Sequence, residues 1–245
     1  MDGSHLTTMP VVLFVGNYGS GKTEVSVNFA IHTAHTGVRT RIADLDLVNP
    51  YFRSREVRDV LEEQGVGVVL PPEEFMNADL PVLTPKVRGL IQRPDGVAIL
   101  DVGGDDVGAT VLASLAPAFQ EGSYEVLQVL NHKRPFTDTL EGVLRIQREI
   151  ETASRLPIAG YVSNSHLMDE TEPETVYEGL ALALEVSGAT GKPVRFITAL
   201  ASVVKELDRE RLGGIPVLPM ERLLLPPWRR RTNAGCQAFS LQGKL

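Results

Sequence analysis

Short apolar runs alternate with longer helix-like segments along most of the chain. The apolar runs have the length of buried strands, and we expect strands at 11–15, 38–43, 66–70, 97–101, 125–130, 158–163 and 193–198. Between them we expect helices at 22–36, 52–64, 84–92, 107–118, 137–154, 173–188 and 200–210. Strands that alternate with helices form βαβ units, which place the strands in one mostly parallel sheet. The pattern therefore predicts a three-layer α/β/α fold with a doubly wound sheet.

A single domain accounts for this pattern. We expect it to span residues 10–245, because no second alternation and no internal repeat follows the first. The polar residues 1–9 are expected to be disordered or a remnant of cloning. The least regular stretch, 71–84, is expected to be a surface loop, and the tail 226–245 shows no clear periodicity.

Composition narrows the classes of function. The formal net charge of −7 argues against general binding of a phosphate backbone, so we expect no nucleic-acid partner. No apolar run approaches the roughly 18 residues of a membrane-spanning helix, so stable membrane insertion is not expected. The first residues lack the apolar core of a secretory signal, and Cys236 is the only cysteine, which fits a reducing cytoplasm.

The segment Gly16–Thr23 reads G-x-x-x-x-G-K-T and lies between an expected strand and an expected helix. This is the setting of a phosphate-binding P-loop, in which glycines let backbone N–H groups converge on phosphate oxygens. Lys22 can reach the β- and γ-phosphates, and the Thr23 hydroxyl can bind Mg²⁺. The residues expected to contact the nucleotide here are Gly16, Asn17, Gly19, Ser20, Gly21, Lys22, Thr23 and Glu24.

Two acids, Asp44 and Asp46, follow the second expected strand. Ligands of open α/β sheets bind at the carboxyl ends of the strands. Beside a magnesium nucleotide, one of these acids can hold the water shell of the metal and the other can orient an attacking water. A helix N-cap followed by a solvated loop acid would give the same pattern.

A third motif is the apolar strand 97–101, which ends in Asp101. This pattern is typical of a Walker B carboxylate that accepts from water on Mg²⁺. Asp101–Gly104 also reads D-x-x-G, in which a glycine N–H such as that of Gly104 can contact the γ-phosphate and respond to its loss. The expected metal site therefore comprises Thr23, Asp44 and Asp101.

Together these motifs resemble those of the CobQ/CobB/MinD/ParA group of SIMIBI-class P-loop NTPases. The resemblance covers residues 10–220 in the order of elements and is specific over Gly16–Thr23, Asp44–Asn49, Asp101–Gly104 and Gly160–Asn164. It implies that Asp46 orients the hydrolytic water and that Asp44 is its companion near the metal. Lys22, Asp44 and Asp46 would then be the catalytic residues. It also implies that the amide of Asn164, after a late strand, reads adenine.

One position departs from the MinD- and ParA-like pattern. Those members carry a lysine where this chain has Asn17, and that lysine reaches across a nucleotide-sandwich dimer. An amide cannot supply this charge, so weak basal turnover is expected. The resemblance implies a Mg-ATP-dependent ATPase with switch segments that acts on an unknown protein partner, with a homodimer as one possible assembly. The alternatives are an ATP-dependent kinase or ligase acting on a small molecule, similar to dethiobiotin synthetase, and a nucleotide-gated binding protein with negligible turnover.

The identity of the base depends on a second segment. Asn131–Arg134 has a superficial likeness to the guanine motif N-K-x-D, but its lysine comes one place late and no Asp follows at the required step. Guanine readout normally uses a carboxylate, so ATP is expected rather than GTP. Asn131 still ends an expected strand and is expected to line the site.

Overall fold

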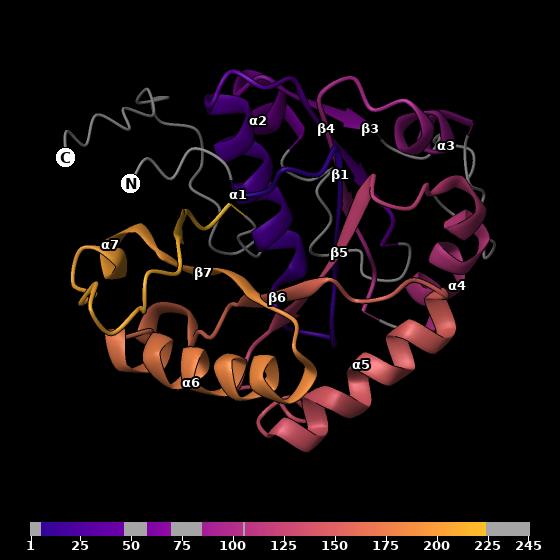
Figure 1. The fold of residues 1–245 in the computed structure, drawn as a ribbon. Coiled ribbons are helices and arrows are strands. Elements are labelled where there is room, and N and C mark those ends of the chain that lie inside the picture. Colours follow the sequence, from indigo (N-terminus) through magenta and orange to yellow (C-terminus); the bar gives the residue numbers. More distant parts are fainter. Residues whose placement is uncertain (1–5, 47–57, 70–84, 105, 224–245) are drawn as a thin grey trace.

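The fold is built on one sheet of eight parallel strands in the order β3-β2-β4-β1-β5-β6-β7-β8. The structure is a computed structural model, and it describes residues 6–46, 58–69, 85–104 and 106–223 (Figure 1). The strands are β1 (Val11–Val15), β2 (Thr40–Asp44), β3 (Val66–Val69), β4 (Val97–Asp101), β5 (Tyr124–Leu130), β6 (Gly160–Ser163), β7 (Val194–Leu200) and β8 (Val217–Met220). The central strand β1 is buried along its whole length, as its unbroken apolar sequence requires when helices cover both faces.

Helices cover both faces of this sheet. They are α1 (Lys22–His35), α2 (Arg58–Glu63), α3 (Pro85–Gln92), α4 (Asp106–Leu115), α5 (Leu140–Ser154), α6 (Pro173–Thr190) and α7 (Ala201–Val204), with 3₁₀ turns at Ala116–Ala118 and Met168–Glu170. Alternate residues of the strands point to opposite faces. One apolar core packs the sheet against α3 to α6, and a second core packs the other face against α1 and α2. The expected three-layer α/β/α fold is confirmed.

The observed elements differ from the expected ones mainly near the C-terminal end of the described residues. All seven predicted strands are present, but the sequence interpretation missed β8, which pairs with β7 through Thr198 and Leu218. The helix predicted at 200–210 is only the short α7, because Leu200 still belongs to β7 and turns follow from Lys205. The loop 71–84, the tail 226–245 and most of 1–9 lie outside the described residues, so the assignment of 10–245 to one domain stays a prediction.

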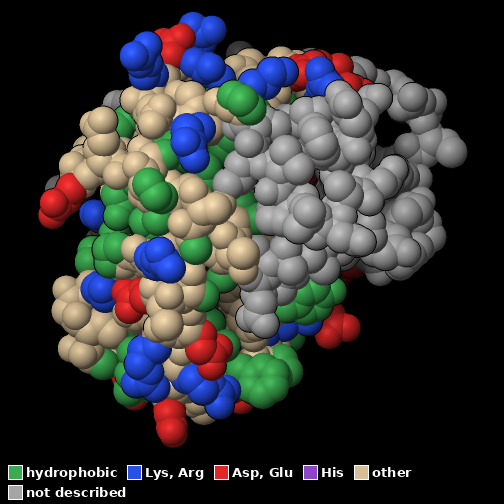
Figure 2. Space-filling view, turned by 90° about the vertical axis from the view of Figure 1, so that its right-hand side faces the viewer, with side chains coloured by type: hydrophobic (Ala, Val, Ile, Leu, Met, Phe, Trp, Pro, Cys, Tyr) green, Lys and Arg blue, Asp and Glu red, His purple; other side chains and the backbone are tan. Residues whose placement is uncertain are grey.

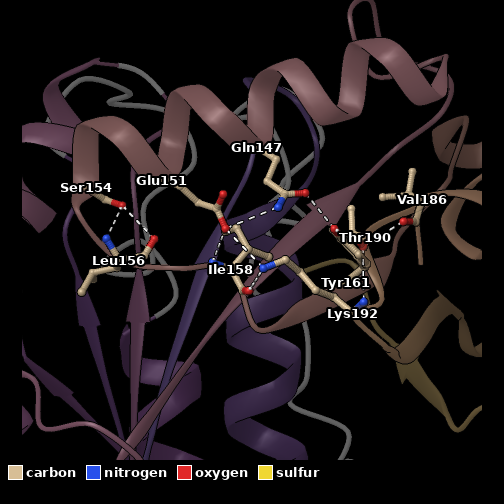
Figure 3. A network of polar contacts seen from close by, with 9 residues as sticks. All are labelled: Gln147, Glu151, Ser154, Leu156, Ile158, Tyr161, Val186, Thr190 and Lys192. Atoms are coloured by element: carbon tan, nitrogen blue, oxygen red, sulfur yellow. Dashed lines mark hydrogen bonds and ion pairs between the residues drawn. The ribbon is translucent and has the colours of Figure 1, made fainter. Parts of the chain in front are cut away.

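A polar network ties the helices to the amino edge of the sheet (Figure 3). Glu151, on the last turns of α5, accepts from the backbone nitrogen of Ile158 at 2.8 Å, from the Gln147 amide at 3.3 Å and from the Lys192 ammonium at 3.5 Å. The hydroxyl of Tyr161, near the start of β6, hydrogen-bonds with Gln147 and Thr190. These contacts fix the C-terminal ends of α5 and α6 relative to β6.

The molecular surface carries mixed charge. On the face shown in Figure 2, the basic and acidic side chains of the described residues are interspersed over the surface. Among the described residues, no helix is both long and apolar enough to cross a membrane.

Candidate functional site

A cavity of about 290 Å³ opens at the carboxyl edge of the sheet. Its lining comes from the segments that follow β1, β2, β4, β5, β6 and β8 and from the C-terminal ends of β7 and β8. The lining residues predicted from the sequence are Gly19, Gly21, Lys22, Thr23, Glu24, Asp46, Gly104 and Asn164. The fold therefore brings the separate motifs of the sequence to one place.

The loop Gly16–Thr23 has the backbone that its glycines allow. Gly16, Gly19 and Gly21 all have positive φ, at 146°, 74° and 88°. A Cβ at Gly16 would also lie 2.7 Å from the carbonyl oxygen of Val129, so the loop passes close against β5. The loop leads directly into the N-terminus of α1 at Lys22, where free backbone N–H groups and the helix dipole favour an anion.

Lys22 is buried, with 7% of its surface exposed, although it lines the cavity. Its Nζ donates to the carbonyl oxygen of Asn17 at 3.0 Å, within the same loop. This bond holds the ammonium group where the loop curves, and an incoming phosphate can replace the carbonyl as its acceptor.

Asp44 and Asp101 end the neighbouring strands β2 and β4 side by side, in register. Both are buried, at 2% and 0% exposure. Asp44 accepts from the backbone nitrogen of Asp46 at 3.0 Å, which turns the chain so that Asp46 lines the cavity. The two acids of the D-x-D motif therefore have different places, Asp44 below the loops and Asp46 at the cavity.

Burial raises the pKa of Asp101 to about 7. The Thr23 hydroxyl, the Lys22 charge and the Ser26 hydroxyl offset part of this rise, and the charge of Asp46 adds to it. A buried carboxylate is costly unless a cation or donors compensate it. The environment of Asp101 is thus one in which a bound cation would favour the ionised form.

Gly104 lies directly against the P-loop. A Cβ at this position would be 2.5 Å from the Nζ of Lys22, 3.0 Å from the backbone nitrogen of Tyr18 and 3.1 Å from the carbonyl oxygen of Gly16. A side chain at this position would displace the Lys22 ammonium and press on the P-loop backbone. The D-x-x-G segment Asp101–Gly104, expected to respond to the γ-phosphate, is among the described residues, whereas residues 47–57, which follow the D-x-D motif, lie outside them.

The loops that follow β5 and β6 hydrogen-bond to three residues of the P-loop. The Asn17 amide donates to the carbonyl oxygen of Pro135 at 3.1 Å. The Nε of Arg134 donates to the carbonyl oxygen of Gly19 at 3.0 Å. The Nδ2 of Asn164 donates to the carbonyl oxygen of Ser20 at 2.7 Å, while its Oδ1 accepts from the Thr198 hydroxyl at 2.6 Å. In this arrangement Asn17 and Asn164 position the loop.

Asn131 is fully buried beneath these loops rather than in the cavity lining. Its Oδ1 accepts from the backbone nitrogens of Lys133 at 3.0 Å and His166 at 3.5 Å, so it joins the loop after β5 to the loop after β6. Ser20 is likewise buried, and its hydroxyl has no hydrogen-bond partner among the described residues.

The far half of the cavity consists of residues that the sequence analysis did not predict. Apolar lining comes from Met168, Ala199, Leu200 and Met220, and polar lining comes from Arg134, His166, Thr171, Thr198 and Arg222. Burial, together with the smaller effect of the Arg134 and Arg222 charges, lowers the pKa of His166 to about 4. His166 is therefore neutral at pH 7. Thr198, Ala199 and Leu200 lie at the end of the strand expected at 193–198, which was the available signal.

Residues 221–223 close this half against α1. Asn28 pairs with the backbone of Glu221 in both directions, at 2.8 and 3.0 Å. Glu24, in the first turn of α1, accepts from the backbone nitrogen of Leu223 at 2.6 Å. Arg222 lines the cavity and pairs with Asp169. The helix that begins at the P-loop thus also fixes the far wall of the cavity.

Comparison with known proteins supports the fold and leaves the finer assignment open. No protein-family model and no curated protein matches the sequence. Among solved structures, FtsY from Mycoplasma mycoides is 18% identical over 78% of this chain and 60% of its own, with a TM-score of 0.54. The signal recognition particle 54 kDa protein from Aeropyrum pernix K1, in complex with GDP, is 20% identical over 78% of this chain and 41% of its own, with a TM-score of 0.52. FlhF complexed with GTP and Mg²⁺ is 18% identical over 79% of this chain and 67% of its own, with a TM-score of 0.50.

The chain spans about 60% of the length of the FtsY protein it resembles. At this level of identity the likeness establishes the fold alone, which is that of a P-loop NTPase. The narrower resemblance to the CobQ/CobB/MinD/ParA group stays a prediction.

Proposed function

We propose that this protein binds and hydrolyses a magnesium nucleoside triphosphate, with ATP as the substrate, and that the γ-phosphate controls its contact with a protein partner. The observation that carries the proposal is the convergence of Lys22, Thr23, Asp46 and Gly104 on one cavity at the N-terminus of α1. Backbone N–H groups and a lysine there match a triphosphate in charge and geometry.

The described residues fit a magnesium ion. Hydroxyl and carboxylate oxygens are the ligands that Mg²⁺ prefers. Thr23 and Asp101, which interact at the first turn of α1, supply them together with Asp44, which lies in register beside Asp101. The raised pKa of Asp101 points the same way, because a nearby divalent cation would compensate its buried charge. When bound, the ion would neutralise charge on the phosphate oxygens.

The chain's own residues have separate tasks in this proposal. Lys22 and the N–H groups of the P-loop bind the phosphates, and Thr23 and Asp101 hold the metal side of the site. Asp46, at the cavity surface, accepts a hydrogen bond from the attacking water and so orients it. Gly104, packed against Lys22 and Tyr18, brings its backbone to the γ-phosphate position, where loss of the phosphate changes its contacts.

The proposal of ATP rests on the far half of the cavity. Met168, Leu200 and Met220 provide apolar surface for a base, and the amide of Asn164 has both a donor and an acceptor for adenine. Asn164 would have to exchange its contacts with Ser20 and Thr198 for contacts with the base. GTP is the alternative nucleotide, because two of the similar structures contain GDP or GTP.

The proposal of a protein partner rests on exposed apolar side chains of the loops that form the rim of the cavity. Tyr18 is 70% exposed, Phe136 61% and Met168 44%, and Tyr18 and Met168 line the cavity itself. Phe136 and Met168 also have positive φ, at 70° and 58°, which is uncommon for residues with side chains. A protein surface that covers this rim would bury apolar area next to the nucleotide.

Turnover tests the proposal directly. We expect the wild type to release phosphate slowly from Mg-ATP, and Asp46→Ala to bind Mg-ATP normally but hydrolyse it at least about 10-fold more slowly, since orienting a water acts in the transition state. Asp138→Ala, which removes an exposed acid outside the cavity, is the matched control. Loss of binding rather than turnover in Asp46→Ala would overturn the role given to this residue.

Competition between ATP and GTP tests the base. We expect ATP to bind more tightly, and Asn164→Ala to narrow its advantage by roughly 5- to 150-fold, the effect of about 1–3 kcal/mol of lost hydrogen bonding. An equal loss for both nucleotides would show that Asn164 only positions the P-loop. Tighter binding of GTP by the wild type would replace ATP in the proposal.

A further inference from the structure

The loop between β5 and α5 holds one arginine, Arg134, against the P-loop. The backbone of this loop is fixed by Asn131, whose carbonyl oxygen accepts from the nitrogen of Arg134 at 3.1 Å and from the Thr137 hydroxyl at 2.9 Å. Lys133, the preceding residue, pairs with Glu178 on α6 at 2.6 Å. The backbone that carries Arg134 is therefore held by contacts of the residues on both sides of it.

The guanidinium of Arg134 lies close to Gly19. Its Nε donates to the Gly19 carbonyl oxygen at 3.0 Å. A Cβ at Gly19 would sit 3.3 to 3.6 Å from the Nε, Cζ and Cδ of Arg134, so the glycine allows the side chain to approach the loop. A guanidinium has five N–H donors in a planar fork, and this bond uses one of them.

The same side chain lines the cavity together with Lys22 and His166. Its charge also reaches His166, since it helps lower the pKa of that imidazole, although burial is the larger cause. Arg134 is thus a fixed cation in the lining of the cavity, beside the P-loop. Asn17, at the position where MinD- and ParA-like members carry a second lysine, supplies no positive charge, whereas Arg134 does.

We propose that Arg134 is a second cation of the phosphate site and donates from its terminal nitrogens to phosphate oxygens of the bound nucleotide. This inference rests on the proposed function, because it needs a nucleotide whose phosphates lie in the P-loop. Its bond to Gly19 holds the guanidinium in place before the ligand arrives, so little side-chain freedom is lost on binding. In this proposal the phosphates meet two positive charges of the same chain, Lys22 in the P-loop and Arg134 beside it.

Affinity for a series of ligands tests the proposal. We expect Arg134→Ala to weaken binding of ADP and ATP by about 10- to 100-fold, the size of a charge-assisted hydrogen bond, and to leave adenosine binding unchanged. Arg145→Ala is the matched control, because Arg145 is exposed on α5, 5.6 Å from the Phe136 ring, and does not line the cavity. Free guanidinium ion should restore nucleotide binding to Arg134→Ala, and the same concentration of potassium should not.

Three outcomes would overturn the inference. An equal loss for adenosine and ADP would place Arg134 at the nucleoside, and no loss for any ligand would make its contact with Gly19 structural only. If Arg134→Ala does not fold, Arg134→Gln keeps a donor for Gly19 without the charge, and unchanged ADP affinity in that variant would count against the proposal. Nucleotide binding that survives Lys22→Ala would instead overturn the proposed function, so the two failures are distinguishable.

Discussion

Polar side chains lie at both the amino and the carboxyl edges of the sheet, but their surroundings differ. At the amino edge, Glu151, Gln147, Tyr161 and Lys192 satisfy one another and nearby backbone groups. At the carboxyl edge, burial raises the pKa of Asp101, and the Ser20 hydroxyl has no partner among the described residues. Polar groups that hydrogen-bond one another stabilise the fold. Buried polar groups without such compensation can instead be stabilised by a bound ligand.

This difference teaches where a substitution should affect binding and where it should affect folding. Removing a group from the carboxyl edge should alter ligand affinity with little loss of stability. Removing a polar group from the amino edge should lower stability and leave ligand affinity unchanged. The following experiments test that separation.

Lys22→Ala should have the largest effect. We expect nucleotide affinity to fall by at least about 100-fold, because Lys22 is the main point charge on the phosphates, while the thermal unfolding midpoint changes little. Calorimetric titration measures the affinity, and Lys205→Ala, which removes an exposed lysine, is the control. Equal affinity in the Lys22 variant would remove the P-loop assignment.

Gly104→Ala should come next. Its new Cβ would lie 2.5 Å from the Nζ of Lys22, which would have to shift, and 3.0 and 3.1 Å from backbone atoms of Tyr18 and Gly16, which would have to give by a few tenths of an ångström. We expect about a 10-fold or greater loss of ATP affinity, measured by the same titration. The control is Gly188→Ala on α6, where a Cβ meets nothing within 4 Å. Normal binding by the Gly104 variant would mean that this loop does not approach the nucleotide.

Glu151→Ala tests the amino edge of the sheet, where a substitution should affect stability rather than binding. Its removal leaves the Ile158 N–H and the Lys192 ammonium without this acceptor, so we expect the free energy of unfolding to fall by about 2–3 kcal/mol. Denaturant unfolding measures this loss, with exposed Glu149→Ala as control. Nucleotide affinity should not change, and a marked change would show that the two edges are coupled.

His166 should give the smallest effect. Its pKa is about 4 in the folded protein and about 6.5 in the unfolded chain. Between these values the unfolded chain binds a proton that the folded protein does not, so folded stability decreases as the pH falls from 6.5 toward 4. We expect this decrease to be about 1–2 kcal/mol smaller in His166→Gln between pH 6.5 and 5. Parallel stability curves for the two proteins would contradict the buried, neutral state of His166.

The sequence predicted the centre of the sheet better than its end. The central strands β1 and β4 are apolar except for Asp101 at the end of β4, and β5 and β7 are mostly apolar, so these runs could be recognised. The missed strand β8 has only four residues and contains Pro219, which normally argues against a strand. It forms because Val217 and Leu218 pair with β7 while Leu218 and Met220 fill the core beside α1, which no local pattern reveals.

The candidate site shows the same limit. Gly16–Thr23 could be predicted because its chemistry lies in eight consecutive residues. Arg134 and Thr198 could not, because their relation to Gly19 and Asn164 depends on which loops meet at the sheet edge. The D-x-D motif was found, but its division into a buried Asp44 and a cavity-lining Asp46 follows from the turn that joins them.

Pro219 also has a consequence for self-association. The carbonyl oxygen of Pro216 bonds to Ile197 of β7, and alternate residues of a strand direct their hydrogen-bonding groups to the same side. Residues 217 and 219 therefore direct theirs away from the sheet. At 219 an exposed proline ring stands where an incoming strand would need an N–H donor. An outer strand interrupted in this way is a poor template for the edge-to-edge addition that begins aggregation.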